Sequence, residues 1–134
     1  MHIVVASANI FRRELSSYIL SEAGYTLSEA SSIASLMTNL RSHNVALLVL
    51  DTQLERDPGL LIGAVRRLSV APILWLGDHG LLRPLISADS QPSAALGWPY
   101  RADELTQQAA ALLGRSAALV SYPHETPLPQ RLAP

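Results

Sequence analysis

Residues 45–51 read VALLVLD, an apolar run from Val45 to Leu50 that ends in Asp51. An unbroken apolar run of this length predicts a β-strand buried on both faces, as in a parallel sheet covered by helices. Open α/β sheets place their ligands and their chemistry at the carboxyl ends of such strands. Asp51 is therefore the first candidate functional residue of the chain.

The rest of the chain alternates short apolar segments with segments of helical periodicity. Ile33, Leu36, Met37 and Leu40, for example, recur with the spacing of one helix face. The β-α unit occurs five times, which predicts a doubly wound parallel sheet with the flavodoxin-like strand order 2-1-3-4-5. The predicted strands are residues 3–6, 25–27, 45–50, 73–76 and 93–96, and the predicted helices are residues 9–23, 32–41, 60–68, 81–87 and 102–113.

Composition limits the class of protein. The chain has 134 residues, 49% of them hydrophobic, a formal net charge of −1 and no cysteine. The absence of cysteine excludes disulfides and thiolate metal sites. The net charge gives no excess of basic residues for direct nucleic-acid binding by this domain. The start lacks a signal-peptide pattern, and no segment has the roughly 20 apolar residues of a membrane span, so a cytoplasmic location away from membranes is expected.

Two regions differ in pattern. Residues 1–115 carry the alternating strands and helices and are predicted to form one folded domain. Residues 116–134 contain Pro123, Pro127, Pro129 and Pro134 and show little periodicity. This second region is predicted to be a Pro-rich linker or a disordered tail.

Several segments resemble one known family when they are taken together. They are LLVLD at residues 47–51 followed by Gly59, APILWL at residues 71–76, and WPY at residues 98–100 followed by Glu104 and Leu105. The spacing from Ile3 to the EAGY of residues 22–25 fits the same family. In order and spacing, residues 3–115 resemble the receiver domain of two-component response regulators.

The resemblance implies phosphoryl transfer to Asp51, which matches the family's phosphoacceptor at the end of the third strand. In the family, two acidic residues after the first strand help to bind a divalent cation. By spacing, these positions fall at Ala8 and Asn9. Mg²⁺ prefers near-octahedral oxygen ligands, and a carboxylate is lost at both positions, so metal affinity should be poor.

Three further family positions have lost their side-chain chemistry. The hydroxyl residue that ends the fourth strand corresponds to Gly77, the aromatic switch residue to Ala95, and the lysine that ends the fifth strand to Trp98. An indole at Trp98 would fill the phosphoryl pocket and could donate its Nε1–H to Asp51 or to a carbonyl. The alternative is a partly buried packing aromatic. Either way, the chain resembles a degenerate, or pseudo-, receiver.

No metal site or other cofactor is predicted. Asp51 has a structural alternative, because a strand-end carboxylate can accept hydrogen bonds from backbone N–H groups of the following loop. Asn9, Asp51 and Asp78 are the weak candidates for metal ligands, and Mg²⁺ would be needed only if Asp51 is a working phosphoacceptor.

Tyr100, Ala109 and Ala110 are the candidate interface residues. Alanines permit close helix packing, and receivers commonly dimerise through their fourth and fifth helices and fifth strand. The alternative is a last helix that packs only on its own sheet.

The expected function is non-enzymatic signal transduction. The module would act through a protein partner or homodimerisation, without standard aspartyl phosphorylation, and would control a transcriptional output domain beyond the Pro-rich segment. One alternative is a functional receiver that an upstream histidine kinase phosphorylates on Asp51. Another is a small-ligand binding domain that uses the crevice at the strand ends.

Overall fold

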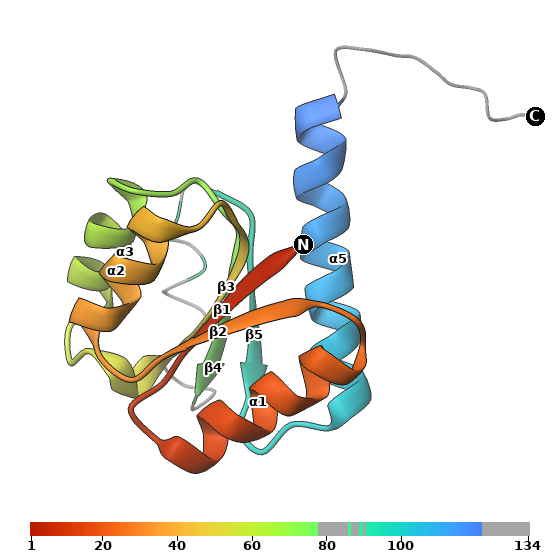
Figure 1. Cartoon of the computed structure of the whole chain (residues 1–134), viewed down its shortest axis with the longest axis horizontal. Helices are drawn as coiled ribbons and strands as arrows, with labels where there is room; N and C mark the ends of the chain where they lie inside the picture. The colour runs from red at the N-terminus through yellow and green to blue at the C-terminus, as the bar shows by residue number, and fades with distance from the viewer. Residues whose placement is uncertain (78–85, 87–88, 90, 122–134) are drawn as a thin grey trace, which may run out of the picture.

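The computed structural model describes residues 1–77, 86, 89 and 91–121 (Figure 1). Its strands form one parallel sheet in the order β2-β1-β3-β4-β5, which confirms the predicted fold. The strands are β1 His2–Ala6, β2 Thr26–Ala30, β3 Val45–Asp51, β4 Ile73–Gly77 and β5 Ser93–Gly97. The helices are α1 Ile10–Glu22, α2 Ile33–Ser42, the short 3-10 turn η1 Thr52–Leu54, α3 Pro58–Arg66 and α5 Ala102–Ser121.

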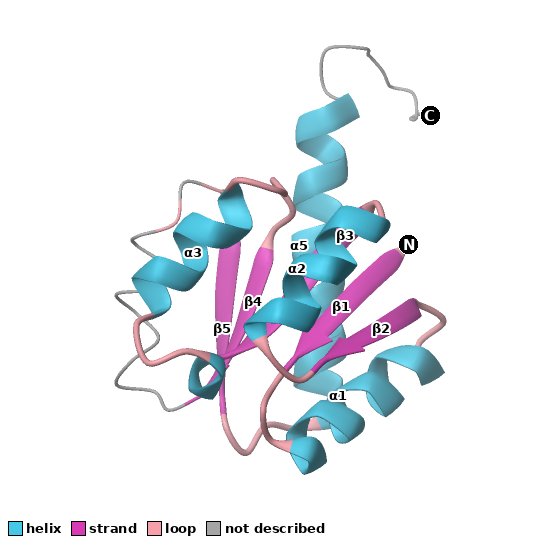
Figure 2. Ribbon diagram, turned by 60° about the vertical axis from the view of Figure 1, so that its left-hand side comes forward, coloured by secondary structure: helices cyan, strands magenta, loops and turns pink. Residues whose placement is uncertain are grey.

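Helices cover both faces of the sheet (Figure 2). Successive side chains of a strand point to opposite faces, so one strand serves two cores. In β1, Ile3 and Val5 pack with α1 and α5, whereas Val4 and Ala6 pack with α2 and α3. None of the helices in the described part of the chain has the length and apolarity that crossing a membrane requires.

Strand β3 lies at the centre of the molecule. Every residue from Leu47 to Asp51 is 0% exposed, as predicted for a strand buried on both faces. Burial of a leucine of this kind contributes about 1.5–3 kcal/mol relative to its exposure in water. Because β3 ends at Asp51, this buried strand holds the Asp51 carboxylate at the carboxyl edge of the sheet.

Among the helices, α3 and α5 differ from the predicted ranges by more than one residue at an end. Helix α3 starts at Pro58 because the Asp57 side chain caps it, accepting hydrogen bonds from the backbone N–H groups of Gly59 and Leu60. Helix α5 continues to Ser121, so it overlaps the segment predicted as a tail. The helix predicted at residues 81–87 falls almost entirely outside the described residues, and the division into a domain and a tail stays a prediction.

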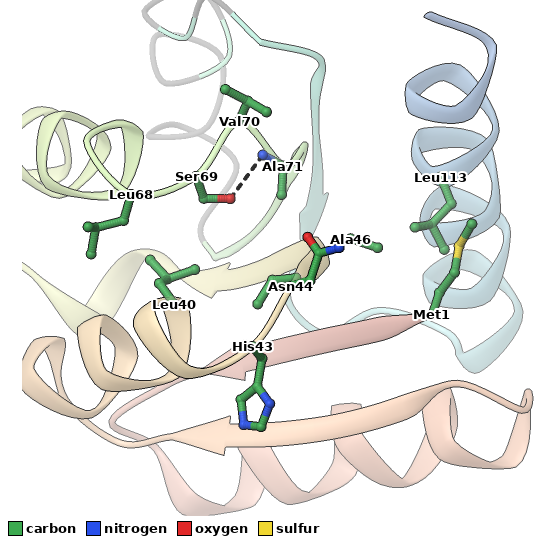
Figure 3. Close-up of a pocket in the computed structure, with 11 residues that line it drawn as sticks. Met1, Leu40, His43, Asn44, Ala46, Leu68, Ser69, Val70, Ala71 and Leu113 are labelled. Carbon is green, nitrogen blue, oxygen red and sulfur yellow. Dashed lines mark hydrogen bonds between the residues drawn. The ribbon is translucent and has the colours of Figure 1, made fainter. Parts of the chain in front are cut away.

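An open pocket of about 400 Å³ lies at the amino-terminal edge of the sheet, opposite to Asp51. Figure 3 shows its lining, which includes His43, Leu40 and Ala71. The ring of His43 stacks on that of His2, with the ring centroids 4.4 Å apart. His2 Nε2 is also hydrogen-bonded to Ser28 Oγ at 2.7 Å. Burial, the neighbouring His43 and the N-terminal ammonium lower the pKa of His2.

The stacked pair of His2 and His43 should make the stability of the protein depend on pH. Because the pKa of His2 is lowered on folding, the unfolded chain binds more protons near the ordinary histidine pKa of about 6.5. The contribution of His2 to the free energy of unfolding should therefore be complete above that pH and should be lost as the pH falls below it. In His2→Gln the free energy of unfolding should fall less, as measured by urea unfolding at about pH 7.5 and about pH 5.5. An equal fall in the two proteins would contradict the assignment.

Candidate functional site

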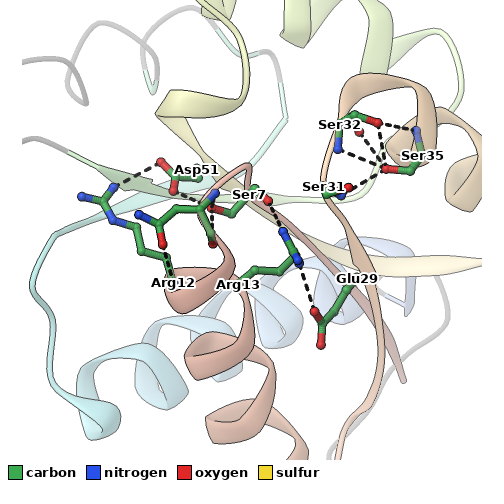
Figure 4. A network of polar contacts seen from close by, with 9 residues as sticks. Ser7, Arg12, Arg13, Glu29, Ser31, Ser32, Ser35 and Asp51 are labelled. Atoms are coloured by element: carbon green, nitrogen blue, oxygen red, sulfur yellow. Dashed lines mark hydrogen bonds and ion pairs between the residues drawn. The ribbon is translucent and has the colours of Figure 1, made fainter.

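The candidate site lies around Asp51 at the end of β3 (Figure 4). Its carboxylate is completely buried and accepts three hydrogen bonds. Ser7 Oγ donates to Oδ2 at 2.7 Å, the backbone N–H of Gln53 donates to Oδ1 at 3.0 Å, and Arg12 Nη1 donates to Oδ1 at 3.4 Å. A buried carboxylate is stable only when it is paired and hydrogen-bonded, and these three donors supply both conditions.

Ser7 is the side chain that reaches Asp51 from the end of β1. The backbone N–H of Ser7 donates to the carbonyl of Ala30 at 3.0 Å, which keeps Ser7 in the sheet edge and leaves it 2% exposed. The next two residues, Ala8 and Asn9, have turned outward and are exposed. Ser7, and not Ala8 or Asn9, is thus the residue after β1 whose side chain contacts Asp51, and the assignment of the two acidic-pocket positions to Ala8 and Asn9 stays a prediction.

Asn9 has a different role. Its side-chain oxygen accepts the backbone N–H of Arg12 at 3.1 Å and caps helix α1. This places Arg12 in the first helical turn, with its guanidinium turned toward Asp51 and its side chain only 12% exposed. Arg13 supports the same loop, since it donates to the carbonyl of Ser7 and pairs with Glu29 of β2.

The residues around Asp51 do not fit the divalent cation of the receiver family. The Asn9 side-chain oxygen is engaged in the helix cap, Ala8 has no side-chain ligand atom, and a guanidinium lies against the carboxylate. Across the described residues, no group of three His, Cys, Asp or Glu side chains is placed to hold a metal ion. Asp78, the remaining weak candidate, lies outside the described residues.

Trp98 lies beneath the Arg12 guanidinium. The guanidinium carbon is 4.8 Å from the centre of the Trp98 ring, which is the geometry of a cation–π contact. Phe11 and Tyr100 meet the same indole edge-on, with ring centroids 6.2 Å and 5.0 Å from it. The predicted hydrogen bond from Trp98 to Asp51 is not formed, since the described donors to Asp51 are Ser7, Arg12 and Gln53.

Thr52 fills the space beside Gly77. A Cβ atom added to Gly77 would lie 2.9 Å from Thr52 Cγ2 and 3.0 Å from Thr52 Cβ. The side chain that ends the fourth strand in the family thus has no room here. Ala95, at the aromatic switch position, pairs in register with Trp75 of β4 and packs against the core on the α2 and α3 face.

The three candidate interface residues differ in how exposed they are. Tyr100 is half-buried, its hydroxyl is hydrogen-bonded to Ser16 of α1, and burial raises its pKa. Ala109 is 0% exposed and packs against the sheet, so it is corrected to a core residue. Ala110, the next residue of the helix, is exposed and remains on the candidate surface.

Sequence reasoning missed Ser7, Arg12 and Thr52. A cation in the first turn of a helix opposes the helix dipole, and this was the available signal for Arg12. Ser7 and Thr52 gave no comparable signal, because their roles depend on contacts with residues far along the chain.

Solved structures with a similar fold include receiver domains and response regulators. The receiver domain of NtrX from Brucella abortus is 22% identical, with a TM-score of 0.74, over 84% of this chain and 98% of that one. A two-component response regulator from Clostridium difficile is 17% identical, with a TM-score of 0.76, over 86% of this chain and 97% of that one. At these identities the likeness shows the receiver fold, while the site must be argued from its own residues.

A longer NtrX structure from the same organism, in complex with ADP, is 23% identical, with a TM-score of 0.79. The match covers 90% of this chain and 28% of that one, so this chain spans under a third of the length of that protein. No protein-family model matches the sequence, and no curated protein matches it by sequence.

Gly77→Ala should destabilise the protein, because the new methyl group would collide with Thr52. Overpacking of this kind costs about 1–3 kcal/mol of unfolding free energy. Adding Thr52→Ala should recover part of the loss, which a double-mutant cycle of urea unfolding would measure. Gly63→Ala in α3 is the matched control, since nothing lies within 4 Å of its added Cβ. Additive effects of Thr52→Ala and Gly77→Ala would contradict the steric account.

Proposed function

We propose that this chain is a receiver-type signalling module that works through protein contacts, without standard aspartyl phosphorylation. The proposal rests on the receiver fold together with one observation at the phosphoacceptor position. The Asp51 carboxylate is completely buried and is engaged by Ser7, Arg12 and Gln53. Both carboxylate oxygens are engaged in this state, so attack on a phosphodonor would require Asp51 to give up at least one of these hydrogen bonds.

The chemistry around Asp51 supports the same proposal. Transfer of a phosphoryl group requires positive charge at the developing oxyanions, and receivers supply it with a divalent cation and a lysine. Trp98 stands at the lysine position and Gly77 at the hydroxyl position. The module is therefore proposed to be non-enzymatic and to need no cofactor.

The surface beside the site offers a place for a protein partner or a second copy of the chain. Ile10 and Phe11, in the first turn of α1, are 60% and 64% exposed. Phe11 also meets the edge of the Trp98 indole. A partner that covers Phe11 would thus contact a side chain that packs against the indole at Arg12, which gives binding a physical route to the site.

We further propose a cytoplasmic module that controls an output domain of a transcriptional regulator, as the family resemblance implies. The similarity to NtrX supports a multidomain context, because the match covers 28% of that longer chain. Direct nucleic-acid binding by the domain itself is not proposed, in keeping with its net charge of −1.

A working phosphoacceptor is the second candidate function. Asp51 stands at the carboxyl end of β3, where receivers carry their phosphoacceptor, and the Ser7 hydroxyl lies within hydrogen-bond distance of it. In this case a histidine kinase would phosphorylate Asp51, and Arg12 would have to leave or to serve as the cation.

Incubation with phosphoramidate and Mg²⁺, followed by intact-mass spectrometry, tests the proposed function. The parent protein should gain no phosphoryl group under conditions that label an ordinary receiver, because Asp51 is paired with Arg12. Asp51→Asn is the control for modification elsewhere. One phosphoryl group on the parent and none on Asp51→Asn would establish the second candidate instead.

A further inference from the structure

We propose that Arg12 is a tethered cation that takes the place of the family's divalent metal at Asp51. This inference rests on the proposed function and explains how the site is held without a metal ion. It assigns a positioning role to a residue of α1 that the receiver resemblance does not implicate.

The position of Arg12 is unfavourable for the helix and favourable for Asp51. Helix α1 has no acidic residue in its first turn, and Arg12 brings a positive charge to the positive end of the helix dipole. The guanidinium is nevertheless held there with its side chain only 12% exposed. The compensating anion is the buried Asp51 carboxylate, 3.4 Å from Nη1.

Asp51 in turn needs a cation. A buried carboxylate without a counter-charge is strongly destabilising, and hydrogen bonds from Ser7 and Gln53 alone leave its charge in place. Arg12 is the cationic side chain that pairs with Asp51 in the described part of the chain. The neighbouring Arg13 is directed instead to Glu29 and to the carbonyl of Ser7.

The departures from the family pattern around Asp51 are consistent in charge when the positive charge of Arg12 is included. In the receiver family, the carboxylates of the pocket are balanced by a divalent cation and a lysine. Among the residues that the structure describes, the charge of Asp51 is balanced by Arg12. A second carboxylate at Ser7 would leave excess negative charge, and a lysine at Trp98 would repel the guanidinium. The indole at Trp98 instead supports the guanidinium through its ring face.

The test compares Mn²⁺ binding in Ser7→Asp and in Ser7→Asp/Arg12→Gln, with free Mn²⁺ measured by electron paramagnetic resonance. Both variants carry a second carboxylate beside Asp51, but only the first keeps the tethered cation. Removal of Arg12 should tighten Mn²⁺ binding at least about tenfold, because the cation position becomes vacant between two carboxylates. Ser7→Asp/Arg67→Gln is the matched control, since it removes an equal charge at the far end of α3 and should bind like Ser7→Asp.

A second pair covers the case in which a buried carboxylate at Ser7 prevents folding, as circular dichroism would show. Ser7→Asn and Ser7→Asn/Arg12→Gln then give the same comparison, because an asparagine at position 7 places a neutral oxygen ligand beside Asp51 without burying a second charge. If the pair that folds binds Mn²⁺ equally well with and without Arg12, the proposal that Arg12 replaces the metal is wrong. That result would not contradict the proposed function.

Phosphoramidate labelling with Mg²⁺ and with EDTA separates the two proposals further. If the parent gains no phosphoryl group and Mn²⁺ binds more tightly when Arg12 is removed, both the proposed function and the role of Arg12 are supported. Label that forms in EDTA and disappears in Arg12→Gln would overturn the proposed function and support Arg12 as the working cation. Label that requires Mg²⁺ would overturn both.

Discussion

Burial of the Asp51 carboxylate determines which groups can surround it. The continuous apolar sequence of β3 places this side chain in the interior, where a charge requires a partner. Ser7 supplies a hydroxyl from β1, Gln53 supplies a backbone N–H from the following turn, and Arg12 supplies the opposite charge from α1. One carboxylate therefore connects the end of β3 and its following turn with the end of β1 and the start of α1, which lie 44 and 39 residues away along the chain.

The aromatic side chains extend this connection to the opposite side of the site. Trp98 contacts the Arg12 guanidinium, and Phe11 and Tyr100 pack edge-on against its indole. The Tyr100 hydroxyl returns to α1 through Ser16. Helix α1 and the loop between β5 and α5 are thus joined by a cation, three aromatic rings and a hydrogen bond. These contacts form one continuous packed network between Asp51 and the loop after β5.

The fold was predictable because its signals are local. The apolar run of β3 and the recurring helical spacing predicted the five β-α units and the position of Asp51, and the strand order was expected as a common one for a doubly wound domain of this length. The start of α3 was also visible as Asp57 followed by Pro58, although it was placed two residues late. The site was less predictable, because Ser7 is directed by a bond to Ala30 and Arg12 by its approach to Asp51 across the fold. Such contacts have no sequence period, so the position of Asp51 could be predicted but its partners could not.

The packing of Thr52 against Gly77 bears on how this site can change during evolution. The two positions exclude each other's side chains, because a Cβ on Gly77 would approach Thr52 Cβ to 3.0 Å. While Thr52 keeps its present position, a larger side chain at position 77 should cost stability. The side chain that is tolerated at one of the two positions should therefore depend on the side chain at the other. Positions 52 and 77 are thus expected to vary together rather than independently.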